Sequence, residues 1–408
     1  MTEQFSFSSE TLSTLATEFP GASRCTYLDS SSTGLMPNRA VEALEGFLAD
    51  RRDHGKTLSL WEEALEAGRA GFAALINADP LDVAYTKNCT EGVNIVATGL
   101  PWVEGDNVVI CADLEHPANI YPWLNQQRRG LRVKRVAPTG LAIDPDAMLS
   151  AIDDRTRALA VSSVSFVPGF RTNLATLIKA CRERDIFLLV DATQSVGVLE
   201  SDVRALPVDG LVASTHKYLL GVYGQGLLYC RREWADRMKP MHLGKPGIDG
   251  SEGHPALDGY EHRLMAGTRH FETGQMPLGA RALAASIGLI REVGTRAVED
   301  HATGLAGRLA AGFDELELPL NLDPYGEGAS HIVTLGELGQ DGLYEVSDPL
   351  LKSIHDALAA AGVRLSARRG QLRFSFHLYN TQADVDRVLE IVRTVVARSG
   401  GAAGGGIG

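Results

Sequence analysis

The stretch from Leu211 to Gly226 reads LVASTHKYLLGVYGQG. It begins as a short apolar segment, continues with Ser-Thr-His-Lys and ends in glycines. Short apolar runs that are rich in valine and leucine and bounded by polar residues are typical of buried strands. The stretch therefore predicts a strand that ends near Ser214 and places His216 and Lys217 directly behind it.

Four further segments of this kind lie nearby, and amphipathic helical patterns separate them. The strand-like segments are GDNVVIC, RALAVSSVSF, DIFLLVDA and GQGLLYC, and NLATLIKACRERD is one of the helical patterns. Strands that alternate with helices imply a mostly parallel sheet with helices on its faces. Such sheets bind ligands beyond the carboxyl ends of their strands. The sequence predicts an α/β fold with a site at the segment ends SSVSF, VDATQ and ASTHK.

The C-terminal part of the chain indicates a second, smaller domain. Residues 239–269 are rich in Gly, Pro and His and are expected to form loops. Long helical patterns and the strand-like segments ASHIVTLG, GVRLSA and LRFSFH follow, which predicts an α+β domain. We expect a large domain at 22–262 and a small domain at 1–21 and 263–395. The Gly-rich tail at 396–408 is expected to be disordered.

Composition excludes several classes of protein. The formal net charge is -12, which argues against nucleic acid and anionic membranes as partners, because both attract a basic face. The five cysteines form no C-x-x-C pair, so neither a disulfide framework nor a metal site is expected. The sequence contains no bilayer-length apolar run and no signal-peptide pattern. We expect a cytoplasmic protein.

Lys217 is the first candidate site residue. A lysine that is partly desolvated at a strand end has a lowered pKa and can act as a nucleophilic amine. Carbonyl cofactors such as pyridoxal phosphate (PLP) require such an amine for a Schiff base. Ser214 and His216 could donate hydrogen bonds to a phosphate beside it. The alternative is an ordinary surface lysine.

Asp191 is the second candidate, because it ends the apolar run LLVDATQSVG. A buried carboxylate is costly unless it is paired. Asp191 or Thr193 could cap a following helix. Alternatively, Asp191 could pair with a protonated pyridine nitrogen, which keeps the ring an electron sink. Gln194 could then donate to the phenolic oxygen of the ring.

Three weaker signals complete the set. Cys89 and Thr90 precede a helical pattern, where the Thr90 hydroxyl and backbone N–H groups could cradle a phosphate or belong to an ordinary capping box. His116 could stack on an aromatic cofactor or be structural. Arg373 alternates with apolar residues in GQLRFSFHLYNT and should point inward. It could bind a substrate carboxylate or form a structural salt bridge.

Taken together, the ordered motifs resemble class V aminotransferases of PLP fold type I. The motifs are YLDSSSTG, NCTEGVN, EHPANIYPW, VDATQ, STHK, FETGQ and LRFSFHLYNT. The resemblance extends from about Tyr27 to Leu389. This family includes cysteine desulfurases, kynureninase and isopenicillin N epimerase. The resemblance implies PLP as cofactor, a mostly parallel seven-stranded sheet in the large domain and a smaller α+β domain.

The resemblance also implies roles for individual residues. Lys217 would form the Schiff base and shuttle protons, Asp191 would bind the pyridine nitrogen, and His116 would stack on the ring. Gln194 would bind the phenolic oxygen. The phosphate would be held by Cys89 through its backbone, Thr90, Ser214 and His216.

Two further sets of residues follow from the resemblance. Gly274 and Gln275 match a loop that reaches the phosphate of the neighbouring subunit, which implies a homodimer with shared active sites. Arg373 matches the arginine that binds the α-carboxylate of an amino-acid substrate. Arg368 and Arg369 could add positive charge for an acidic or bulky substrate, or form a solvated turn.

Departures from the family pattern shape the expected reaction. Desulfurases carry a persulfide-forming cysteine in the small domain, whereas this chain has no cysteine after Cys230. Phe166 stands where desulfurases have an asparagine, and Gln275 stands where a threonine is common. We expect a C–S lyase that acts by β-elimination on an S-substituted cysteine, through an external aldimine and a Cα carbanion. An aminotransferase, an epimerase and a decarboxylating or condensing enzyme remain alternatives. A non-enzymatic sensor is disfavoured because Lys217 is present.

Overall fold

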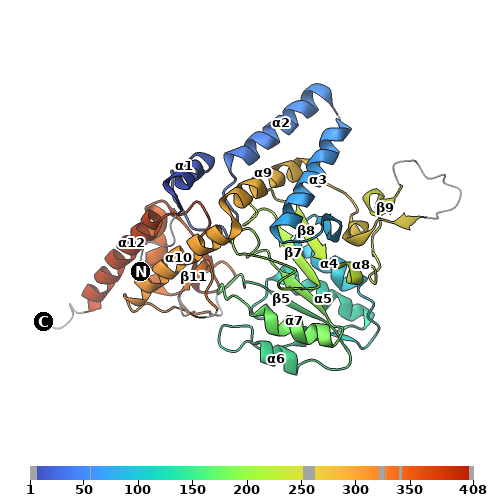
Figure 1. Ribbon diagram of the computed structural model, residues 1–408. Coiled ribbons are helices and arrows are strands. Elements are labelled where there is room, and N and C mark those ends of the chain that lie inside the picture. The colour runs from blue at the N-terminus through green and yellow to red at the C-terminus, as the bar shows by residue number, and fades with distance from the viewer. Residues whose placement is uncertain are drawn as a thin grey trace.

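The computed structural model describes residues 7–55, 57–250, 262–320, 326, 328–339 and 342–403. Figure 1 shows the main sheet with its helices on the right, and the helices and strands of the C-terminal part on the left. The long helices α2 (Asn38–His54) and α3 (Leu58–Leu75) both pack against α9 (Pro277–Val293), above the sheet (Figure 1).

The main sheet has seven strands in the order β2-β8-β7-β6-β5-β3-β4. All neighbouring strands pair in parallel except β8, which runs antiparallel to β2 and β7. This confirms the predicted α/β fold with a mostly parallel sheet, and the five predicted segments form β3, β5, β6, β7 and β8. The strands are β2 (Val83–Thr86), β3 (Asn107–Ile110), β4 (Arg132–Arg135), β5 (Thr156–Ser162), β6 (Phe187–Asp191), β7 (Gly210–Ser214) and β8 (Gly226–Cys230).

Both faces of the sheet are covered, which explains the continuous apolar runs. Along β6, Leu188 and Val190 belong to the core beneath α7 (Leu174–Glu183). The alternate residues Phe187 and Leu189 belong to the core beneath α4 (Cys89–Gly99). The edge strand β4 was not predicted, because its sequence RVKR is charged and not an apolar run. Charge on an edge strand discourages pairing with other chains.

The C-terminal part is built on a three-stranded antiparallel sheet in the order β11-β14-β13. The N-terminus joins it, because β1 (Thr26–Tyr27) pairs in parallel with β12 (Val363–Arg364). The ring of Phe7 also stacks on His301, with centroids 4.1 Å apart. The start of the chain thus lies against the C-terminal part, although β1 falls inside the predicted 22–262 domain, and the domain division at 21 and 263 stays a prediction. The strands are β11 (Ile332–Leu335), β13 (Ser366–Arg368) and β14 (Gln371–Ser375), and the helices are α10 (Thr295–Asp314), α11 (Pro349–Ala360) and α12 (Gln382–Ala403).

The remaining elements are short or connect the two parts. They are α1 (Ser9–Glu18), α5 (Tyr121–Asn125), α6 (Pro145–Ser150), α8 (Arg232–Ala235), β9 (Ile248–Asp249) and β10 (Arg263–Leu264), together with single 3-10 turns. The predicted loop at 239–269 is mostly irregular where it is described, although β9 and β10 form a small antiparallel pair. Residues 251–261 of that loop lie outside the described residues.

The predicted disordered tail differs from the structure in its first half. Helix α12 continues to Ala403, so residues 396–403 are helical. An established helix gains one hydrogen bond for each residue that it adds, which extends it through residues of low intrinsic propensity. Ser399 also donates its hydroxyl to the carbonyl oxygen of Val395. Residues 404–408 lie outside the described residues.

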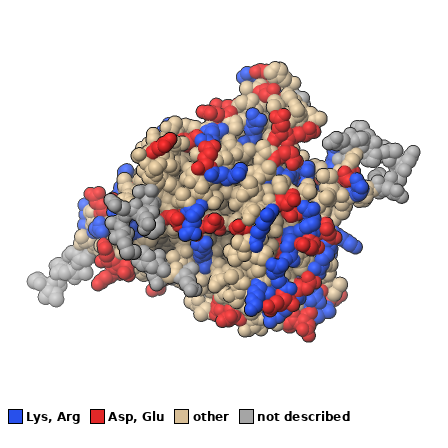
Figure 2. Space-filling view, in the orientation of Figure 1, with Lys and Arg blue, Asp and Glu red and all other residues tan. Residues whose placement is uncertain are grey.

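The surface is charged without a broad basic face on the side shown in Figure 2. Side chains of both signs intermix there, most densely at the lower right. Within the described part of the chain, no helix combines the length and the apolar character that a membrane span requires.

Candidate active site

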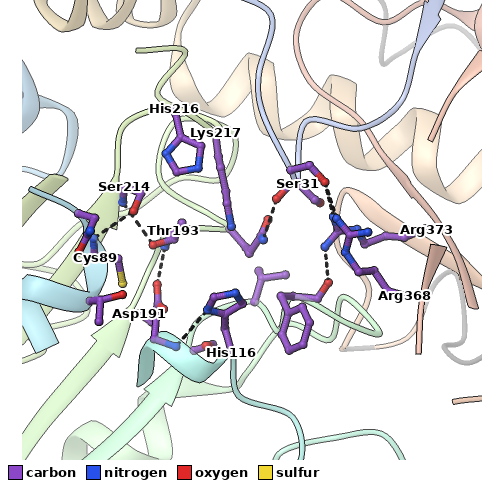
Figure 3. A pocket seen from close by; sticks show the side chains of 18 of the residues that line it. Ser31, Cys89, His116, Asp191, Thr193, Ser214, His216, Lys217, Arg368 and Arg373 are labelled. Carbon is purple, nitrogen blue, oxygen red and sulfur yellow. Dashed lines mark hydrogen bonds between the residues drawn. The ribbon is translucent and has the colours of Figure 1, made fainter. Parts of the chain in front are cut away.

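A cavity of about 340 Å³ opens at the carboxyl ends of β5, β6 and β7. The last residues of these strands, Ser162, Asp191 and Ser214, all line it, and Figure 3 shows Asp191 and Ser214 on one side of it. The main sheet therefore supplies one wall, as expected for a parallel sheet. The full lining is Ser31, Ser32, Asn88, Cys89, Thr90, His116, Ala118, Ser162, Val164, Phe166, Asp191, Thr193, Gln194, Ser214, His216, Lys217, Leu343, Tyr344, Arg368 and Arg373.

Lys217 extends into the middle of this cavity (Figure 3). Desolvation and, next in size, the positive charge of Arg373 lower the pKa of its amine from 10.5 to about 8. Asp191 and Cys89 act in the opposite direction. The alternative of an ordinary surface lysine is therefore wrong.

A chain of hydrogen bonds links the strand ends to the start of α4. Asp191 Oδ1 accepts from the backbone N–H of Thr193 at 2.9 Å, and Thr193 Oγ1 accepts from the N–H of Ser214 at 3.3 Å. Ser214 Oγ in turn accepts from the N–H of Cys89 at 3.0 Å. A turn and not a helix follows Asp191, so the helix-cap alternative for this residue is wrong.

The start of α4 combines a cap with the cavity wall. Asn88 is the N-cap residue, and its side chain accepts from the N–H of Glu91 at 2.9 Å. Thr90, in the first turn, lines the cavity. The capping alternative therefore holds for this motif, while the phosphate cradle stays a prediction, which the positive end of the helix beside the cavity favours.

His116 and His216 reach the cavity from two different loops. His116 Nδ1 accepts from the N–H of Ala118 at 3.1 Å, so the neutral ring carries its proton on Nε2. Burial and the charge of Lys217 lower the pKa of His116. Burial also lowers the pKa of His216 to about 4, and its ring stacks on Tyr223 with centroids 4.1 Å apart. Both rings are therefore neutral at neutral pH.

Arg373 enters the cavity from β14 and is held on three sides. It donates to the carbonyl oxygen of Phe166 at 2.8 Å, to Ser32 Oγ at 2.9 Å and to Ser366 Oγ at 3.2 Å. The carboxylate of Asp29 forms an ion pair with Arg373, with Oδ1 of the aspartate 3.6 Å from the guanidinium nitrogen. Burial lowers the pKa of Arg373 to about 10, which still leaves the guanidinium charged at neutral pH.

The two arginines of the neighbouring turn behave differently. Arg368 lines the cavity, donates to Ser32 Oγ at 2.8 Å and lies over the ring of Tyr344 at 4.7 Å. Arg369 points elsewhere and donates to the carbonyl oxygen of Asp113 at 2.7 Å. The solvated-turn alternative therefore describes Arg369 and not Arg368.

Two of the predicted site residues are not brought to this cavity. Gly274 and Gln275 are absent from its lining within the described chain. The Gln275 amide donates to Glu272 Oε2 at 2.6 Å, and Glu272 also pairs with the buried Arg69 at 2.6 Å. The predicted contact of this loop with a neighbouring subunit stays a prediction.

Sequence reasoning assigned no role to Ser31, Ser32, Ser162 and Tyr344. Ser31 and Ser32 belong to the motif YLDSSSTG, whose run of hydroxyl groups before a glycine is the signal that could have identified them. Gly34 N–H donates to the carbonyl oxygen of His216 at 2.9 Å, which places this N-terminal segment against the loop of Lys217.

Comparison with known proteins identifies the family. Residues 26–388 match the family described as Aminotransferase class-V. The chain belongs to this family.

Relatives and solved structures agree with this assignment. A probable cysteine desulfurase from Methanothermobacter thermautotrophicus is 29% identical over 387 residues, which cover 90% of this chain and 94% of that protein. The apo structure of a cysteine desulfurase from Thermococcus onnurineus NA1 superposes with a TM-score of 0.82 at 25% identity, covering 94% of this chain and 98% of the other. The cystine C–S lyase C-DES, solved with its product cysteine persulfide, shares the fold with a TM-score of 0.79 at 23% identity, covering 92% and 98% of the two chains.

Class-V aminotransferases are PLP-dependent enzymes, and the predicted family, fold and cofactor are confirmed at this level. The cavity of this class-V protein also fits PLP chemically. It contains a desolvated amine on Lys217, a buried carboxylate on Asp191 and the positive end of α4. The side-chain amide of Gln194 donates to the carbonyl oxygen of Ser31 at 3.2 Å, and its oxygen is buried without a partner among the described atoms. The predicted bond from Gln194 to the phenolic oxygen of the ring stays a prediction.

Proposed function

We propose that the protein is a PLP-dependent C–S lyase, which eliminates the sulfur group of an S-substituted cysteine or of cystine without a persulfide on the enzyme. The positions of the cysteines give the most direct support for a reaction without an enzyme persulfide. The chain has no cysteine after Cys230, and Cys89 is the one cysteine among the described lining residues. Burial raises the pKa of Cys89 well above its usual value, which makes its thiol a poor nucleophile at neutral pH.

The first requirement of such a lyase is an electron sink at Cα of the substrate. PLP supplies this chemistry when it is bound. Asp191 would hold a proton on the pyridine nitrogen through a charge-assisted hydrogen bond. His116, which lies above the strand ends, would cover the face of the ring.

The second requirement is an anchor for the phosphate. Ser214 Oγ already accepts from Cys89 N–H, so its own hydrogen stays available for a phosphate oxygen. Thr90 and the positive end of α4 would add donors. His216 is neutral at pH 7 and would bind as a hydrogen-bond donor and not as a cation.

The third requirement is recognition of the amino acid. The guanidinium groups of Arg373 and Arg368 both donate to Ser32 Oγ. A carboxylate that binds beside Ser32 would therefore meet two cations. Phe166 would give the substrate an apolar wall on the side of His116, since the two rings pack edge to face at 5.2 Å.

Lys217 would move the proton at Cα. Its pKa of about 8 leaves a useful fraction of the amine uncharged near neutral pH. In the elimination, the Cα proton passes to this amine, its electron pair forms the Cα=Cβ bond, and the C–S pair leaves on sulfur. Addition of water to the product then gives pyruvate and ammonium, while the sulfur leaves as a thiol or, from cystine, as a persulfide.

We also propose a homodimer in the cytoplasm. A groove of about 620 Å³ shares Asn88 and Thr90 with the cavity and continues past Met241 to Thr273. Met241 is 52% exposed, and a second copy would cover it and bring Gln275 close to the neighbouring phosphate site. All five cysteines are free, which fits a reducing compartment. Sedimentation of a PLP-loaded monomer would contradict the dimer.

The deciding experiment is to identify the products of a single turnover. The PLP-loaded protein is offered cystine, S-alkyl cysteines and ordinary amino acids, and the products are quantified by mass spectrometry. Pyruvate with regenerated PLP supports the lyase. Pyridoxamine phosphate with a matching keto acid identifies an aminotransferase, and an amino acid inverted at Cα identifies an epimerase.

A further inference from the structure

Glu115 is a buried carboxyl group that the proposed chemistry leaves unused. Its side chain is only 3% exposed and carries three short hydrogen bonds. Oε1 accepts from the backbone N–H of Ser162 at 2.6 Å, and Oε2 accepts from the Ser162 hydroxyl at 2.6 Å. Oε2 also accepts from the side-chain amide of Asn119 at 2.9 Å. A buried carboxyl group that accepts three hydrogen bonds is held in a defined orientation by its donors.

The two residues that bond to Glu115 connect it to the active site. Ser162 ends β5, lines the cavity and lies opposite Asp191 in the register of β5 and β6. Asn119 ends the 3-10 turn that starts after His116, and its N–H donates to the His116 carbonyl oxygen at 2.8 Å. Glu115 therefore ties the loop that carries His116 to the sheet edge that carries Asp191.

We propose that Glu115 is a positioning residue that fixes His116 above the cofactor site and adds a second negative charge beside Asp191 below it. The proposal rests on the PLP function proposed above. It concerns residues of this chain alone and needs no partner subunit. Within the described chain no Lys or Arg forms an ion pair with Glu115, so its charge acts on the site without local cancellation.

The electrostatics of the pocket support this role. The pKa of Glu115 rises from 4.5 to about 7, because burial and the charge of Asp191 outweigh the hydrogen bonds from Ser162 and Asn119, which lower it. The ionisable groups that face it are Asp191 on β6 and Cys111 at the end of β3. Its protonated form can still donate to Ser162 Oγ, so both charge states keep hydrogen bonds.

The test compares the PLP-loaded wild type with Glu115→Gln and the control Asp113→Asn. Asp113 is exposed on the same loop and does not line the cavity, so the control removes the same charge outside the site. The side-chain oxygen of Asn119 is buried without a partner among the described atoms. If the Asn119 amide group turns over, this oxygen can accept a hydrogen bond from the new side-chain amide of Glu115→Gln. The readout is the pH midpoint of the visible absorption band of lysine-bound PLP.

We expect Glu115→Gln to lower this midpoint by about one pH unit, because a nearby negative charge favours the protonated chromophore. Asp113→Asn should leave it unchanged. If Glu115→Gln does not fold, Ser162→Ala replaces it. That variant removes one donor to the carboxylate, favours protonated Glu115 and should give a smaller shift in the same direction.

The outcomes separate this proposal from the proposed function. A normal wild-type band with an unmoved midpoint in Glu115→Gln, or in Ser162→Ala when that variant replaces it, overturns the role of Glu115 alone. Equal shifts in Glu115→Gln and Asp113→Asn overturn it as well, because the effect would then be a general one of charge. A wild-type protein that gives no band of lysine-bound PLP contradicts the proposed function and this proposal together.

Discussion

Arg373 on β14 donates a hydrogen bond of 2.8 Å to the carbonyl oxygen of Phe166, which lies 207 positions earlier in the chain. This bond joins the C-terminal sheet to the loop behind β5 at the wall of the active site. It uses the backbone of Phe166, so it is independent of the side chain at that position. The phenylalanine is therefore free to shape the substrate wall while the arginine stays in place.

Replacement of this arginine should mainly weaken substrate binding. We expect Arg373→Gln to raise the KM for every accepted amino acid, at a cost of about 2–5 kcal/mol for a broken buried charge pair. Steady-state kinetics across the substrate panel measure the effect. Arg369→Gln is the control, because Arg369 lies outside the cavity lining and bonds only to a backbone oxygen in the described chain. An unchanged KM for all substrates would remove Arg373 from the site.

Lys217→Ala should abolish the visible band of lysine-bound PLP and the turnover of all substrates. Lys217 is the one lysine among the described lining residues, and its amine can form the covalent link to the cofactor. The exposed Lys179 on α7 provides the control variant Lys179→Ala, which should keep a normal spectrum. Absorbance spectra before and after borohydride reduction decide the matter. A surviving reducible band in Lys217→Ala refutes the assignment.

The buried amine should also make the apo protein less stable below pH 8 than a variant that lacks it. The pKa of Lys217 falls from 10.5 to about 8 on folding, so the folded state binds fewer protons between these values. Stability of the wild type should rise with pH across this window. We expect Lys217→Met to gain about 3 kcal/mol below pH 8 and to lose this advantage towards pH 10.5. Urea unfolding at several pH values measures it, and a pH-independent difference would contradict desolvation as the cause.

Cys89→Ala should retain the lyase activity. Its thiol is buried and its pKa is raised, so it is not expected to accept sulfur. Loss of the side chain should lower the free energy of unfolding by about 1 kcal/mol. Cys25→Ala serves as the control outside the cavity lining. A loss of sulfur release in Cys89→Ala alone, together with a persulfide on Cys89 in the wild type, would favour a desulfurase mechanism.

Gly34→Ala should disturb the loop of Lys217. A Cβ atom at this position would overlap the carbonyl oxygen of Lys217 and the side chain of Leu220. We expect a loss of about 1–3 kcal/mol of stability and weaker PLP binding. Gly46→Ala is the matched control, since Gly46 lies inside α2 with nothing near its added Cβ, and it should gain about 0.5–1 kcal/mol. Thermal unfolding and PLP titration compare the two, and equal behaviour would contradict the close contact.

Much of the fold could be predicted from local patterns. Five strands of the main sheet are apolar runs. Both faces of that sheet are buried, so the side chains that point to either face are apolar. The edge strand β4 carries charge instead and escaped the same pattern. The C-terminal end of α12 was also not predicted, because the Gly-rich composition of the tail does not show how far an established helix continues into it.

The site divides in a similar way. Ser162, Asp191 and Ser214 could be placed together from the sequence, because parallel strands end at one edge of the sheet. The contrast between Arg368 and Arg369 could not be predicted. Arg368 ends β13 and lines the cavity, whereas Arg369 begins the turn with a φ of 49° and points away.

The sequence by itself determined five strands of the main sheet, the lysine and aspartate at their ends and the family to which the motifs belong. Each of these depends on residues that are neighbours in the chain. Only the tertiary structure decided that Ser32 meets both Arg368 and Arg373, and that Glu115 accepts hydrogen bonds from Ser162. These contacts join segments that are distant in sequence, and their free energy arises from the packing of the two sheets and their loops, which no single segment encodes.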